Sequence, residues 1–145
     1  MRRLFLALSL AAVATAAQAS PPPKEKQSVG QYVDLSPVAL PIVVGGKLVN
    51  YVFVTVRINL TASADSPKMR EKEPYFRDAL VRAGHRAPFS RRDDFTRLDE
   101  ARLKSTLLRE AAAIAGARNV ASVVIVSQTP KQRVSVPRPK TAPAG

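Results

Sequence analysis

The clearest pattern in the chain is an alternation of apolar and polar residues in KLVNYVFVTVRINL, residues 47–60. The apolar positions, which would all point to one side of a strand, are Val52, Val54, Val56, Ile58 and Leu60. The polar residues Thr55, Arg57 and Asn59 alternate with them. A period of two residues is typical of a strand with one buried face. We therefore predict a long, half-buried strand here.

An apolar segment, QYVDLSPVALPIVV at residues 31–44, precedes this strand and is interrupted by Pro37 and Pro41. Proline cannot donate a backbone hydrogen bond, which confines it to edge strands or to breaks in a strand. The dipeptide Gly45-Gly46 follows and is a strong signal for a two-residue hairpin turn. The pattern thus predicts a proline-containing edge strand joined by a tight turn to the long strand.

The next segment, residues 66–83, has the period of a helix. Its apolar face comprises Met69, Phe76, Leu80 and Ala83. Ser66 can cap its start, and Gly84 can end it. Pro74 lies inside the segment, where a proline costs a helix about 3 kcal/mol. We therefore expect one helix that bends at Pro74.

A second helix is expected over residues 97–115. Thr96 and Asp99 have the spacing of a capping box, and Gly116 can end the helix. The predicted buried stripe contains Leu103, Leu107, Leu108, Ala111, Ile114 and Ala115. The segment NVASVVIVSQ, residues 119–128, then reads as a last strand. Because residues 123–126 are continuously apolar, we expect this strand in the centre of the sheet, covered on both faces.

This order of elements predicts an α+β domain over residues 31–128. The small sheet would contain the edge strand, the hairpin, the long strand and the last strand, with two helices covering it. In a domain of this size the interface between helices and sheet makes up nearly the whole core.

The N-terminal 19 residues have the form of a secretory signal peptide. Arg2 and Arg3 precede an apolar run, and Ala17-Gln18-Ala19 resembles a cleavage site. The pair of arginines partly resembles a twin-arginine signal, and an uncleaved membrane anchor is the alternative to cleavage. Residues 20–30, SPPPKEKQSVG, read as a proline-rich linker. We therefore expect an exported, periplasmic protein.

The C-terminal segment, residues 129–145, contains four prolines and no acidic residue. We expect it to form a disordered basic tail, with the charged residues Lys131, Arg133, Arg138 and Lys140. The whole chain has a formal net charge of +12. Such a charge favours contact with anionic lipid headgroups or cell-wall polymers, or it simply maintains solubility. We expect no nucleic-acid partner, because the protein is predicted to be exported.

The residues available for chemistry do not form a catalytic pattern. His85 is the only histidine, and we expect it on a surface loop. The paired carboxylates Asp93 and Asp94 lie among arginines, which favours a solvated charge cluster. The chain contains no cysteine, no metal-ligand spacing and no glycine-rich phosphate loop. We therefore predict a protein that is not an enzyme and that has no cofactor, metal or small-molecule substrate.

One segment resembles a known family. The sequence KEPYFRDALV, residues 72–81, is similar to the hallmark of the flagellar basal-body-associated FliL family, in which a proline, an aliphatic or aromatic pair and Arg-Asp-Ala lie in the first periplasmic helix. The matching positions are Pro74, Tyr75, Phe76, Arg77 and Asp78. Residues 32–35, 51–63, 98–111 and 120–128 resemble further family segments in the same order. The resemblance covers about residues 32–128.

The resemblance implies a non-enzymatic periplasmic domain, similar in fold to stomatin-like domains, that lies at the inner membrane beside the flagellar stator units. It also implies self-association into a ring that supports torque. The bend at Pro74 would then either shape a surface for subunit contact or fit the helix to a twisted sheet. The alternative function is a soluble basic envelope protein that binds anionic polymers or headgroups without a flagellar role.

Overall fold

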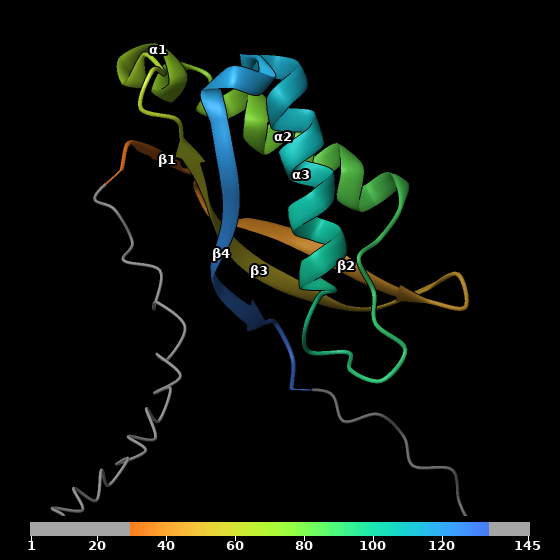
Figure 1. Cartoon of the computed structure of the whole chain (residues 1–145). Coiled ribbons are helices and arrows are strands. Elements are labelled where there is room, and N and C mark those ends of the chain that lie inside the picture. Colours follow the sequence, from red (N-terminus) through yellow and green to blue (C-terminus); the bar gives the residue numbers. More distant parts are fainter. Residues whose placement is uncertain (1–29, 134–145) are drawn as a thin grey trace, which may run out of the picture.

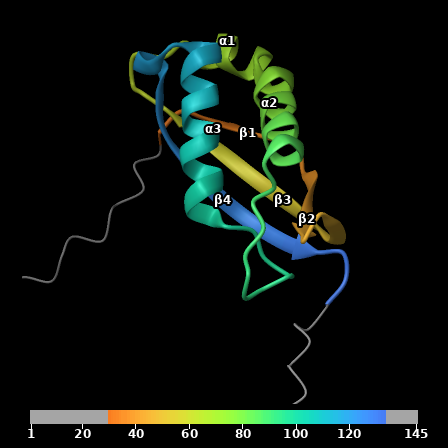
Figure 2. The same ribbon diagram turned by 90° about the vertical axis from the view of Figure 1, so that its right-hand side faces the viewer.

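The computed structural model describes residues 30–133, in which a four-stranded antiparallel sheet packs against helices (Figure 1). The strands are β1 (Tyr32–Asp34), β2 (Val38–Val44), β3 (Lys47–Leu60) and β4 (Val120–Pro130). The helices are α1 (Ser66–Glu71), α2 (Glu73–Arg86) and α3 (Glu100–Ala115), and a 3-10 turn, η1 (Ala117–Asn119), precedes β4. Figure 2 shows α2 and α3 on one side of the sheet. The predicted α+β class is confirmed.

The long strand β3 is the centre of the sheet. Strands β1 and β2 pair with the same side of β3, at residues 57–59 and 47–54. Strand β4 pairs with the other side of β3, over residues 52–60. Gly45 and Gly46 form the β2–β3 turn with φ values of 57° and 74°. These positive φ values suit a two-residue hairpin and are easily adopted by glycine. The predicted hairpin and edge strand β2 are therefore confirmed.

The inward side chains of β3 form the floor of the core. All five predicted apolar positions of this strand are buried. On the helices, Phe76, Leu80, Leu103 and Leu107 are buried against them. The predicted stripe of the second helix is correct in its centre, whereas Leu108 is 37% exposed.

The expected single bent helix is wrong, because two helices meet at Lys72. Asp65, and not Ser66, caps the first of them, with its Oδ1 accepting the N–H of Lys68 at 3.1 Å. Lys72 ends α1 and also precedes α2, so Pro74 lies in the first turn of a new helix. A first-turn N–H has no partner within its helix, and proline is favoured there. Pro74 therefore carries no interior-helix penalty.

Gly84 does not end the helix as expected. Helix α2 continues through His85 to Arg86, so the lone histidine is helical and not in a loop. Gly84 is buried, and a Cβ at this position would lie 2.8 Å from Cδ2 of Leu40 on β2. The glycine therefore permits close approach of α2 to the sheet.

The second helix also begins later than expected. Asp99 is its N-cap, and its Oδ1 accepts the N–H of Arg102 at 3.1 Å. Thr96 instead donates its hydroxyl proton to Asp94, with 2.6 Å between the oxygens. The capping box over Thr96 and Asp99 is therefore not formed, because Asp99 itself is the cap.

The expected central position of the last strand is wrong. Within residues 30–133, β4 pairs only with β3, so it is an edge strand. Helix α3 covers one face of β4. Val124 and Val126 of this strand are 39% and 54% exposed. A continuous apolar run thus misled the prediction, since only alternate residues of β4 reach the core.

The strand also continues past the expected domain end at residue 128. The N–H of Lys131 donates to the carbonyl oxygen of Tyr51 at 2.8 Å. The buried Asn50 donates to the carbonyl oxygens of Phe95 and Gln132 at 2.9 and 2.7 Å, and its Oδ1 accepts the N–H of Gln132 at 3.2 Å. The first residues of the predicted tail are therefore part of the domain. The predicted signal peptide, nearly all of the predicted linker and residues 134–145 lie outside the described residues.

Two truncations test where the domain ends. A chain that stops after Gln128 loses both contacts of Gln132 with Asn50, and an unpaired buried polar group costs about 1–3 kcal/mol. We expect its free energy of unfolding in urea to fall by that amount. A chain that stops after Arg133 keeps these contacts and should match the full chain. Equal stability of the two truncated chains would contradict this boundary.

Candidate functional site

The segment that resembles the family hallmark forms the start of α2. Phe76 is fully buried in the core, whereas Tyr75 is 64% exposed and Pro74 is exposed beside it. Arg77 lies 3.6 Å from Glu73, and Asp78 forms an exposed ion pair with Arg82 at 2.9 Å. The segment therefore has a packing residue and an exposed polar and aromatic side. Surface ion pairs of this kind contribute little to stability.

Glu73 joins this segment to the sheet. Its Oε1 accepts the backbone N–H of Ser36, in the link between β1 and β2, at 2.9 Å. A carboxylate in the first turn of a helix also interacts favourably with the helix dipole. The start of α2 is thus held in a fixed position over the β1–β2 end of the sheet, which keeps Tyr75 in a defined place on the surface.

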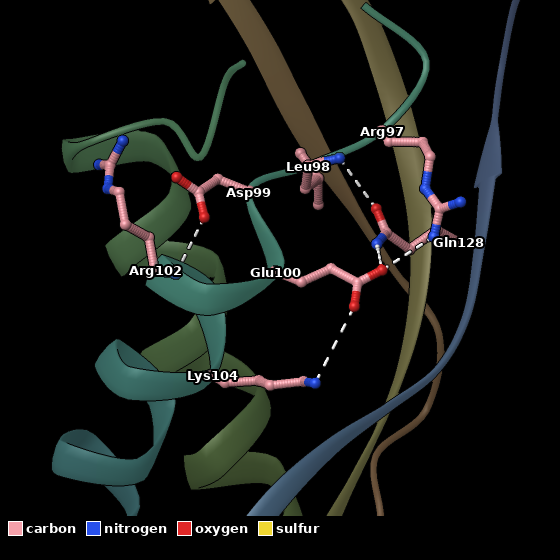
Figure 3. Close-up of polar contacts among 7 residues, drawn as sticks. All are labelled: Arg97, Leu98, Asp99, Glu100, Arg102, Lys104 and Gln128. Carbon is pink, nitrogen blue, oxygen red and sulfur yellow. Dashed lines mark hydrogen bonds and ion pairs between the residues drawn. The ribbon is translucent and has the colours of Figure 1, made fainter. Parts of the chain in front are cut away.

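A polar network joins β4 to the start of α3 (Figure 3). The Gln128 side chain points from β4 toward α3, where its Oε1 accepts the N–H of Leu98 at 2.9 Å and its Nε2 donates to Glu100 at 2.8 Å. Arg97 donates to the same carboxylate oxygen at 2.9 Å, and Lys104 lies 3.9 Å from the other oxygen. The amide of Gln128 is half-buried, and both its oxygen and its nitrogen are hydrogen-bonded. This network fixes the start of α3 on β4.

The face of the sheet opposite the helices is not covered by any described element (Figure 1). Tyr32, Phe53 and Val124 lie on it with exposed fractions of 40%, 45% and 39%. Arg57 stacks over the Tyr32 ring at 3.9 Å and forms a two-point ion pair with Asp34, at 2.6 and 3.0 Å. The hydrogen bonds to Asp34 raise the pKa of Arg57. This face therefore carries apolar side chains among polar ones, and its Arg57 and Asp34 charges are paired with each other.

The loop before α3 carries the acidic pair considered from the sequence. Arg91 binds Asp93 at 2.8 Å and lowers the pKa of that carboxyl, and the Thr96 hydroxyl lowers the pKa of Asp94. Both carboxylates are therefore ionised partners of neighbouring groups. An open depression of about 630 Å³ beside this loop has a mixed lining of arginines and carboxylates.

The structure does not bring the acidic pair Asp93 and Asp94 together with His85. The His85 ring contacts the carbonyl oxygen of Val81 in its own helix, 3.1 Å from Nδ1. In the part of the chain from residue 30 to 133, no group of three metal-binding side chains could hold an ion. Nor does any helix in that part have the length and apolarity to cross a membrane.

The predicted basic tail is divided by the end of the described chain. Lys131 and Arg133 are exposed, and the Lys131 ammonium lies 6.0 Å from the centre of the Tyr51 ring. Arg138 and Lys140 lie outside the described residues. The structure therefore describes two of these four basic residues.

Sequence reasoning did not identify Asn50 or Gln128 as anchors of β4. Each is a single amide in a strand, and no pattern of spacing distinguishes it from an exposed polar residue. A polar residue at position 50, where the alternation of β3 requires an inward side chain, was the only available signal for Asn50.

Comparison with known proteins did not assign a family. No protein-family model matches the chain, and no curated protein matches it.

Two substitutions separate packing from surface at the start of α2. Phe76→Ala removes a fully buried ring and should lower the free energy of unfolding by about 3–5 kcal/mol. Pro74→Ala changes an exposed first-turn residue, so only the restriction of the unfolded chain is lost, at about 0.4–1 kcal/mol. Urea denaturation measures both. A large gain in stability for Pro74→Ala would show that the proline strains the helix after all.

Proposed function

We propose that the protein is a non-enzymatic periplasmic accessory protein of FliL type, which supports the stator units of the flagellar motor and associates with itself. The observation that carries this proposal is the division of the hallmark-like segment at the start of α2. Phe76 fixes the segment in the core, while Pro74, Tyr75 and Asp78 remain on the surface. Tyr75, at the centre of the segment, can contact a partner because its side chain is 64% exposed.

The arrangement of the described side chains also supports a role in binding. The side-chain amides of Gln128 and Asn50 are hydrogen-bonded within the fold, and the carboxylates of the α3 loop have neighbouring partners. Exposed apolar residues lie on the sheet face, on β4, on α3, at the β2–β3 hairpin and at Tyr75. Apolar surface that is exposed and held by rigid elements is typical of protein contact. A stomatin-like topology and a place at the inner membrane are parts of the same proposal.

Deletion of the gene in its motile host tests this function. We expect normal swimming in dilute medium and impaired swimming under viscous load, because stator support is needed when torque is high. Wild-type protein and the Leu48→Ala variant should restore swimming, whereas Tyr75→Ala should not. Leu48 is a suitable control because it is 54% exposed at the β2–β3 hairpin, away from α2.

Two results would contradict the proposal. The first is normal swimming of the deletion strain under load. The second is full restoration by Tyr75→Ala, which would remove the role of the hallmark-like surface. Normal swimming together with salt-sensitive binding of the purified chain to anionic vesicles would favour the basic envelope protein instead.

A further inference from the structure

The two edges of the sheet differ in what they offer to another strand. Leu40 and Ile42 of β2 lie opposite even-numbered residues of β3, which bond on this side of the sheet. Pro41, which lies between them, therefore directs its backbone groups away from β3. Pro41 has no N–H to donate. The N–H of Val43 donates to the Ser90 hydroxyl oxygen at 2.8 Å. At these two positions the β2 edge therefore offers no free N–H to another strand, and Ala39 is the remaining residue of β2 whose N–H points away from β3.

The β4 edge is open. Val56 and Leu60 of β3 form backbone hydrogen bonds on the β1 side, through Leu35 and Gln31. The odd-numbered residues of β3 therefore bond to β4, and the partners of Arg57 and Asn59 are Val124 and Ser122.

It follows that Val123 and Ile125 direct their N–H and C=O groups away from β3. Within the described chain, no hydrogen bond outside the sheet ladder reaches these groups. Two bulges, at Ala121 and Val126, limit the regular part of this edge to residues 122–125.

The composition of β4 does not protect this edge. Proteins commonly guard an open edge with lysine, other charges or proline. The sequence VASVVIVSQTP of β4 contains no charged residue, and its one proline is the last residue of the strand. The whole chain is 23% charged, whereas β4 carries no charge along its length.

We propose that β4 pairs with β4 of a second copy of this chain, antiparallel about a two-fold axis at Val124. In this arrangement Val123 exchanges backbone hydrogen bonds with the partner's Ile125, and Ile125 with the partner's Val123. Val124 then faces the partner's Val124 on the uncovered side of the sheet. The two sheets become one continuous sheet across the seam. The inference rests on the proposed function for its purpose, since it names the surface of self-association.

A second copy is the fitting occupant because the β4 edge is complementary to itself. Antiparallel pairing about a two-fold axis uses the same residues on both sides and brings no like charges together. Two-fold pairing occupies both β4 edges, so association through this seam stops at two copies.

Helix α3 offers additional apolar surface beside this seam. Glu100, Lys104 and Leu108 are spaced by four residues and lie along one side of the helix. Glu100 bonds to Gln128, so this side is turned toward β4 (Figure 3). Leu108 is 37% exposed and is therefore placed next to the seam, where burial against the partner would be favourable.

Single-cysteine variants test the arrangement directly, because the chain has no cysteine of its own. Facing residues of a pair that is not hydrogen-bonded lie about 4.5 Å apart at Cα, within the disulfide range of about 4.4–6.8 Å. Val124→Cys should therefore give at least about tenfold more oxidised dimer than Phe53→Cys. Phe53 is the matched control, because it lies on the same face with similar exposure but on the central strand.

A second pair of variants tests the same contact without cysteine. Val124→Lys places two like charges directly opposite each other in the dimer and should shift the full chain to monomer in sedimentation. Val124→Thr keeps a β-branched, uncharged side chain and should retain the dimer. Both changes lie at an exposed position, and circular dichroism of the variants confirms that they are folded.

The outcomes separate this inference from the proposed function. Equal cross-linking of the two cysteine variants, a wild-type chain that sediments as a monomer, or an unchanged dimer in Val124→Lys would overturn the β4 seam. An unchanged dimer in Val124→Lys would do so while leaving self-association through another surface in place. A cross-linked dimer at position 124 in a protein whose deletion leaves swimming intact would support the seam and remove the flagellar function.

Discussion

The structure depends on β3, a strand that pairs on both sides but is buried on only one face. Its inward residues carry the core, so α2 and α3 must lie on that face and the opposite face stays open. Its two pairing sides are used differently, by β1 and β2 together and by β4 alone. The open edge of β4 follows from this division, because no other described strand pairs with β4.

The centre of the fold could be predicted because its sequence patterns are regular. The start and end of α2 could not, because they depend on local geometry at single residues. The alternation in β3 and the two glycines of the hairpin each determine one conformation, and both predictions are confirmed. Pro74 was misread because periodicity continues across the joint at Lys72, although a proline in the first turn is favourable. Gly84 was misread because a glycine that permits close packing on Leu40 looks like one that ends a helix.

The place of β4 and its contacts could not be derived from its own sequence. A run of valines is compatible with a strand covered on both faces, and only the pairing partners decide that β4 is at the edge. Asn50 and Gln128 hold this strand through single amide groups, whose partners are distant in sequence and have no spacing rule. The exposed part of the candidate site therefore depends on tertiary structure, whereas Phe76 and its helix face were visible from periodicity.

The backbone N–H groups of Val123 and Ile125 point away from β3 at the open edge of β4. Hydrogen exchange of the Val123 and Ile125 N–H groups, measured by NMR at increasing protein concentration, tests it most directly. Pairing of β4 with a second copy predicts that both amides exchange quickly in dilute solution and become protected as concentration rises, while the Ala39 amide on the β2 edge does not change. Concentration-independent exchange at both positions would contradict the account.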